Sequence, residues 1–267
     1  MTIMTMIILA FCGILTNTMS ALFGIGGGVL MVPILHTLFP EFSMQMVAAT
    51  SLTTVMGTAM INLIYFYRQH IAIRAKLLIW CSIGMLIGVQ LGFEGSFLVP
   101  NEFIVWVFVI TLIVLSLVVL MSKPKAQAVT VASNVEYIKG VFLCAFGGSV
   151  AGMTGIGGGS IMSPLLALLP SIKIYQIAVY SNVMMILGGI GSLYSYLNKT
   201  PPVYLENSWQ IGYVNFSVVL IVIAFSFVTS FFSMKIRGVC QSKVMRHWLV
   251  GILLSLSGYM LVLQYAM

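Results

Sequence analysis

A run of glycines that occurs twice constrains the fold of this chain more than any other feature. The quintet Gly24 to Gly28 returns at 155–159, and a proline follows each copy at the same distance. Residues 24–65 align with 155–196 without a gap. Self-similarity over such a length indicates that the chain is a duplication of one unit.

The glycine runs lie within sequence that is too apolar for a soluble domain. Of 267 residues, 60% are hydrophobic and only 6% are charged, whereas charged residues make up about 25% of an ordinary soluble domain. We therefore expect a polytopic membrane protein with the lipid bilayer as its surroundings. The formal charge of +7 does not indicate nucleic-acid binding, because the basic residues fall in short loops between apolar runs, where they set membrane orientation.

The lengths of the apolar runs predict the order of the membrane segments. A run of about 20 residues can cross the hydrocarbon core as a helix, and a run of about 10 cannot. The predicted fold is an all-α polytopic membrane protein with about eight long helices plus two short half-helices at the glycine-rich breaks. The predicted long segments cover 3–23, 45–67, 77–98, 103–121, 137–154, 175–197, 209–234 and 244–265, and the half-helices cover 29–39 and 160–169.

The one sustained polar stretch divides the chain into its two predicted halves. We expect a first transmembrane repeat over residues 1–121, a cytoplasmic linker over 122–136 and a second transmembrane repeat over 137–267. Gly84, Gly88 and Gly92 recur at fourfold spacing in the first repeat. Small residues at this spacing let a neighbouring helix approach closely, so they predict a packing seam.

The distribution of lysine and arginine predicts the orientation of the halves. Basic residues gather in the loop from Arg68 to Lys76, in the linker and in the loop from Lys235 to Arg246. Cytoplasmic loops carry such an excess, so these three loops are predicted to lie inside. The loop at Lys199, which aligns with Arg68, then lies outside. The halves are therefore predicted to have inverted topology in the membrane, with both termini periplasmic or extracellular.

Two helix breaks at corresponding places in inverted halves predict a transporter binding site near the middle of the bilayer. Consecutive glycines leave their N–H groups uncovered, and the start of the following helix adds a partial positive charge, so the breaks favour an anion. Pro33 and Pro164 leave a second interpretation open. If they lie beyond the first helical turn, each removes the partner of an earlier carbonyl, on Val29 or Ser160, and such carbonyls could bind a cation.

Polar side chains follow each break at aligned positions. Thr50 and Ser51 align with Ser181 and Asn182, and their hydroxyl and amide groups could donate to an oxyanion. The alternative is that they bond to the backbone of their own or a neighbouring helix. The candidate substrate-binding residues are Gly26, Gly27, Gly28, Pro33, Thr50, Ser51, Gly157, Gly158, Gly159, Pro164, Ser181 and Asn182.

Several kinds of chemistry are disfavoured by residues that the chain lacks. It contains no aspartate and no GxSxG sequence, which excludes a Ser-His-Asp triad and a nucleophile elbow, and no Lys-Ser or Lys-Thr follows the glycines as a phosphate-binding loop requires. The four cysteines form no CxxC pair, so we expect neither a metal nor another cofactor. His70 and His247 lie in or beside basic loops, which leaves His36 as the candidate histidine within the membrane, and its aligned position is Ala167. An enzyme is therefore not expected.

The motifs around the breaks resemble those of the TauE/SafE family of sulfite exporters. The first copy has GxGGG, Pro33 and Ala48-Ala49-Thr50-Ser51-Leu52, and the second has GxGGG, Pro164 and Val179-Tyr180-Ser181-Asn182-Val183. The resemblance covers nearly the whole chain and implies a bacterial inner-membrane permease for small, mostly sulfur-containing anions. Tyr180 and Asn182 depart from the first copy, so a symmetric site is not expected.

The sequence thus predicts a secondary carrier or facilitator for a small anionic solute, such as sulfite or an organosulfonate. Two alternatives stay open: a cation carrier, and a non-transporting membrane scaffold or assembly factor. A homo-oligomer is compatible with the sequence. Coupling to protons would need an ionisable group in the membrane, for which His36 and Glu94 are the candidates.

Overall fold

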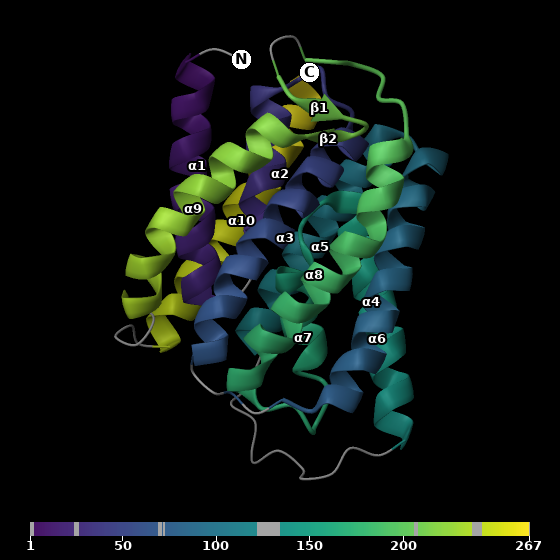
Figure 1. Cartoon of the computed structure of the whole chain (residues 1–267), viewed down its shortest axis with the longest axis vertical. Helices are drawn as coiled ribbons and strands as arrows, with labels where there is room; N and C mark the ends of the chain where they lie inside the picture. The colour runs from purple at the N-terminus through teal and green to yellow at the C-terminus, as the bar shows by residue number, and fades with distance from the viewer. Residues whose placement is uncertain are drawn as a thin grey trace.

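The computed structural model describes residues 3–23, 27–68, 71, 73–121, 134–205, 208–236 and 242–266, and these are almost entirely helical (Figure 1). Two short helices, α2 (Gly28–Leu38) and α7 (Gly158–Leu166), follow the two glycine breaks. The long helices are α1 (Ile3–Phe23), α3 (Met44–Arg68), α4 (Ala75–Gly95), α5 (Asn101–Met121), α6 (Asn134–Thr154), α8 (Ile174–Asn198), α9 (Phe216–Ile236) and α10 (Ser242–Ala266). The predicted all-α architecture is confirmed.

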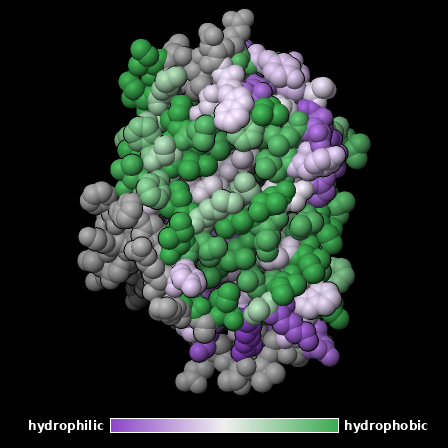
Figure 2. Space-filling model, viewed as in Figure 1, coloured by the Kyte–Doolittle hydropathy of each residue, from purple (hydrophilic) through white to green (hydrophobic). Residues whose placement is uncertain are grey.

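The surface is that of a multi-pass membrane protein. Within the described residues, six helices are long and apolar enough to span a bilayer, namely α3, α4, α5, α6, α8 and α10. In α1 and α9, shorter apolar stretches cover 3–18 and 216–230. Figure 2 shows apolar residues across the middle of one face and polar residues towards both ends. Helices suit this environment because they satisfy their own backbone groups without water.

The helices pack in pairs that correspond between the two halves of the chain. α1 packs against α9 and α6 packs against α4, while α2 contacts α10 and α7 contacts α5. Two further pairs join helices that correspond to each other, α3 with α8 and α5 with α10. In Figure 1, α1 starts and α10 ends at the upper end of the molecule, whereas α6 starts at the lower end. Helices α1 and α6 therefore run in opposite directions.

The glycine seam predicted on α4 is confirmed. A β-carbon at Gly84, Gly88 or Gly92 would collide with the carbonyl oxygens of Val141, Ala145 and Ser149 on α6. Contact at this distance is possible only between backbones without intervening side chains. The seam fixes α4 against α6 along the length of both helices.

The predicted helix over 209–234 is wrong in its first part. Two short strands, β1 (Gln210–Ile211) and β2 (Val214–Asn215), pair as an antiparallel hairpin before α9 begins. Gly212 turns the hairpin with φ +56°, in the left-handed region that glycine adopts without strain. Tyr213 then packs against Phe97, with 5.3 Å between the ring centroids. The apolar run predicts that the helix extends back to residue 209. The turn at Gly212 and the packing of Tyr213 on Phe97 favour the hairpin there instead.

Helix α6 begins at Asn134, so residues 134–136 of the predicted linker are helical. Glu136 lies in the first turn, where the helix dipole favours a carboxylate. Its Oε1 accepts hydrogen bonds from the backbone N–H (2.9 Å) and the hydroxyl (2.6 Å) of Ser171. These bonds tie the start of α6 to the turn between α7 and α8. Residues 122–133 lie outside the described part of the chain.

Candidate solute-binding site

The two glycine breaks touch each other in the interior of the molecule. α2 starts at Gly28 and α7 starts at Gly158, each directly after its break. Gly28 lies against the carbonyl group of Ile156 and the nitrogen of Gly157, so closely that no β-carbon would fit. The N-terminal ends of two short helices, one from each half of the chain, therefore meet. Of the glycines predicted to bind substrate, Gly26 lies outside the residues that the structure describes.

The second break is held open by backbone conformation and by a hydroxyl from the first half. Gly155 and Gly157 have φ values of +74° and +82°, which L side chains rarely adopt. The N–H of Gly155 donates to the carbonyl of Ala151 (2.8 Å) and closes the last turn of α6. The buried hydroxyl of Ser51 donates to the carbonyl of Gly155 (2.7 Å). Helix α3 thus contributes directly to the geometry of the second break.

The backbone at the junction presents donors. In α2, the N–H groups of Leu30 and Met31 both lie 3.2 Å from the carbonyl of Gly27, and the N–H groups before them belong to the unpaired first turn of a helix. The partial positive charges of two helix starts add at one point. At Gly28 the nearest atoms to a β-carbon belong to the backbone of Ile156 and Gly157, whereas at Gly157 they belong to the side chain of Val55. Helix starts of this kind suit an oxyanion.

Both prolines lie inside their helices, beyond the first turn. Pro33 and Pro164 therefore remove the N–H groups that would otherwise bond the carbonyls of Val29 and Ser160. Pro164 also lines an apolar cavity of about 260 Å³ between α5, α6 and α7. Both prolines thus have the position that the carbonyl-based alternative requires.

The four predicted polar side chains have different roles. Thr50 donates to the carbonyl of Tyr213 (3.4 Å) and accepts from the N–H of Asn215 (3.2 Å), so it anchors the hairpin. Ser181 and Asn182 donate to Ala178 on their own helix, at 3.1 Å and 2.6 Å. Of the four, Ser51 is the one with a described hydrogen bond to a glycine break. All four side chains donate to backbone carbonyls, as the backbone-bonding interpretation describes.

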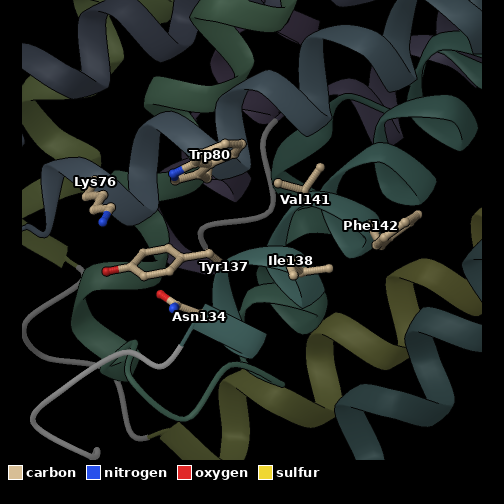
Figure 3. A pocket seen from close by; sticks show the side chains of 7 residues that line it. All are labelled: Lys76, Trp80, Asn134, Tyr137, Ile138, Val141 and Phe142. Atoms are coloured by element: carbon tan, nitrogen blue, oxygen red, sulfur yellow. The ribbon is translucent and has the colours of Figure 1, made fainter.

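A groove between α4 and α6 lies apart from the predicted site. Its volume is about 330 Å³, and Figure 3 shows its lining, which includes Lys76, Trp80 and Tyr137. The Nζ of Lys76 lies 5.2 Å from the centroid of the Tyr137 ring. A lysine beside aromatic rings at the first turns of apolar helices is typical of the membrane interface. None of the predicted site residues lines this groove.

The sequence analysis missed a polar cluster beside the first break. Thr16, Asn17 and Ser20 lie buried on α1, and Asn62 lies buried on α3. A β-carbon at Gly27 would lie 2.8 Å from the β-carbon of Thr16, which brings the cluster next to the break. The only sequence signal is that the three α1 residues fall on one helical face.

Comparisons with known proteins agree with this architecture. The sequence profile of the family described as "Sulfite exporter TauE/SafE" matches residues 9–260, which contain both breaks. A "Probable membrane transporter protein" of Haemophilus influenzae is 48% identical over 262 residues, covering 98% of this chain and 97% of that protein. A "Probable membrane transporter protein" of Methanocaldococcus jannaschii is 27% identical over 261 residues, covering 96% and 95% of the two chains.

Proposed function

The chain belongs to the TauE/SafE family, and from this premise we propose that it is a secondary carrier or facilitator for a small anion. The proposed substrates are sulfite, an organosulfonate or a related sulfur-containing anion. The observation that carries the proposal is the contact of Gly28 with Ile156 and Gly157. It brings two helix starts together, and helix starts bind anions through their N–H groups.

The proposed architecture is a pair of inverted-topology repeats. It is supported by the opposite directions of α1 and α6 in Figure 1 and by the corresponding helix pairs, α1 with α9 and α6 with α4. In each half, a 21-residue helix precedes a short helix and a 25-residue helix follows it. The hairpin before α9 is an addition to the second half. Transporters of this design bind substrate where broken helices of the two repeats meet.

The proposed mechanism is alternating access around the junction. With Gly28 packed on Ile156 the junction is closed, so a solute enters only when the two halves separate on one side. The freed N–H groups of the two helix starts then coordinate the anion's oxygens without the cost of a buried cationic side chain. Gly26 to Gly28 and Gly157 to Gly159 contribute backbone donors. Ser51 positions the second break through Gly155.

The proposed location is the cell inner membrane, with both termini outside. Lys76 lies in the first turn of α4 and Lys139 in the second turn of α6. Both helices start at the lower end in Figure 1, and an excess of such residues favours the cytoplasmic side. At the other end of α4, the Nζ of Lys199 lies 2.6 Å from Glu94 Oε2. This pair links α4 to α8 near the proposed outer surface.

Flux measurements on the purified protein in liposomes test the proposed function. The panel contains sulfite, sulfate, an alkylsulfonate and a simple carboxylate, and the membrane potential is varied to report the charge that moves. We expect saturable flux of sulfite or the sulfonate. Absence of flux for every solute would favour the scaffold alternative. Saturable flux of a cation alone would favour a carrier that uses the carbonyls before Pro33 and Pro164.

A further inference from the structure

Two amide side chains in the polar cluster carry buried oxygens that have no hydrogen-bond partner. Asn17 Nδ2 donates to the backbone carbonyl of Ser226 (2.9 Å) and to the hydroxyl of Thr229 (3.3 Å). Asn62 Nδ2 donates to Ser20 Oγ (3.3 Å). Within the part of the chain that the structure describes, the Oδ1 atoms of both asparagines are buried and have no hydrogen-bond partner. Because a carbonyl only accepts, the bond to Ser226 fixes which end of the Asn17 amide is the oxygen.

The cluster joins three helices close to the first glycine break. Asn17 links α1 to α9, and Asn62 links α3 to α1. Both side chains are more than nine-tenths buried, with exposed fractions of 0% and 3%. A buried carbonyl oxygen that the chain leaves without a partner is costly. These two oxygens therefore indicate a ligand that the chain itself does not provide.

The neighbouring groups are also acceptors. The hydroxyls of Thr16, Thr58 and Ser226 donate to backbone carbonyls of Cys12, Val55 and Gly13, at 2.8, 2.9 and 3.0 Å. Their hydrogens are thus engaged, while their oxygen lone pairs remain available. Helix α1 ends at Phe23, within one turn of Ser20, and the end of a helix carries partial negative charge. The cluster suits a cation and disfavours an anion.

The second half of the chain has no comparable cluster at the aligned positions. Gly148 aligns with Asn17, and Leu193 aligns with Asn62. A β-carbon at Gly148 would lie 2.8 Å from the backbone oxygen of Met85, so this position serves helix packing there. The fold can therefore be built without the asparagines, and their presence in one half needs another explanation.

We propose that Asn17 and Asn62 bind a monovalent cation of the size of sodium through their Oδ1 atoms. A divalent ion would require carboxylate ligands, and the cluster residues are neutral. A proton would need a titratable group, and asparagine, serine and threonine offer none. Since Thr16 packs on Gly27, an ion here lies beside the first break. The coupling of this ion to transport rests on the proposed function, but its binding does not.

Binding of ²²Na⁺ to the purified protein, without any anion, tests the site. We expect saturable binding to the wild type and a loss of affinity of about 10- to 100-fold in Asn62→Leu, since a ligand to a charged group is removed. This variant places at position 62 the leucine that the second half has at the aligned position, Leu193. Asn198→Leu, at an exposed position on α8, should bind as the wild type does. Equal binding by Asn62→Leu, or none by the wild type, overturns the proposal and leaves water as the occupant.

A second variant keeps the test decisive if Asn62→Leu does not fold. Asn62→Asp retains an oxygen ligand and adds negative charge, so it should bind sodium at least as tightly as the wild type; a loss of binding in the folded variant contradicts the site. Sulfite flux with sodium or choline outside then separates the two proposals. Sodium binding without any anion flux supports the ion site and contradicts the transport function. Anion flux without sodium binding supports the transport function and contradicts the ion site.

Discussion

At the residue scale, single buried hydrogen bonds such as that from Ser51 to Gly155 connect the two halves. The alignment identified Ser51 because its position corresponds to Asn182. It did not reveal that Ser51 donates to Gly155, because correspondence between repeats says which residues are equivalent and not which residues touch. Asn17 and Asn62 were missed for the same reason. One polar residue in an apolar run has no visible partner until helices are packed.

The substitution Ser51→Ala tests the contribution of this hydroxyl. It leaves the buried carbonyl of Gly155 without its donor, so we expect the free energy of unfolding to fall by about 1–3 kcal/mol. Unfolding in mixed detergent micelles measures the change. Ser116→Ala is the matched control, because the Ser116 hydroxyl bonds within its own helix to Leu112. An equally large loss in both variants would contradict a special role for Ser51.

At the element scale, the lengths of apolar runs predicted nearly every helix, because crossing a bilayer sets a minimum length. The hairpin before α9 was the exception. Ile211, Tyr213 and Val214 are as apolar as helical residues nearby, and what separates them is the turn at Gly212 and the packing of Tyr213 on Phe97. Both depend on structure that an apolar pattern does not encode.

The glycine seam between α4 and α6 gives a prediction at this scale. Gly88→Val places side-chain atoms where the carbonyl of Ala145 lies, so the helices must separate. We expect little or no monodisperse protein on gel filtration after extraction in mild detergent. Gly251→Val on α10 is the control, since nothing lies within 4 Å of a β-carbon there. Normal recovery of Gly88→Val would show that the seam tolerates a gap.

At the scale of the whole molecule, the duplicated glycines predicted one site near the middle of the bilayer, and the contact between Gly28 and Gly157 brings the two breaks together. The sequence did not predict that the junction would be closed. An alternating carrier has several conformations that differ little in free energy, and the same residues serve all of them. Which conformation is the most stable depends on packing summed over both halves.

The predicted orientation can be measured by thiol labelling. Leu98 and Tyr67 are 87% and 82% exposed. Tyr67 lies in the last turn of α3 and Leu98 just after α4, so they are predicted to face opposite sides of the membrane. In a Cys240→Ser background, Leu98→Cys should react with an impermeant maleimide added to intact cells, whereas Tyr67→Cys should react only after the membrane is opened. The buried thiols of Cys12, Cys81 and Cys144 should remain unlabelled. The reverse pattern would place the termini inside and refute the proposed topology.

The most direct test of the central claim is sulfite flux through Gly28→Ala in liposomes, normalised to folded protein. The added methyl group meets the carbonyl of Ile156 and blocks the point where the two helix starts converge. Gly258→Ala, where a β-carbon has open space, is the control. We predict that flux falls more than about tenfold, or about 1.4 kcal/mol, in Gly28→Ala and is unchanged in Gly258→Ala. Undiminished flux through folded Gly28→Ala would contradict transport at the junction.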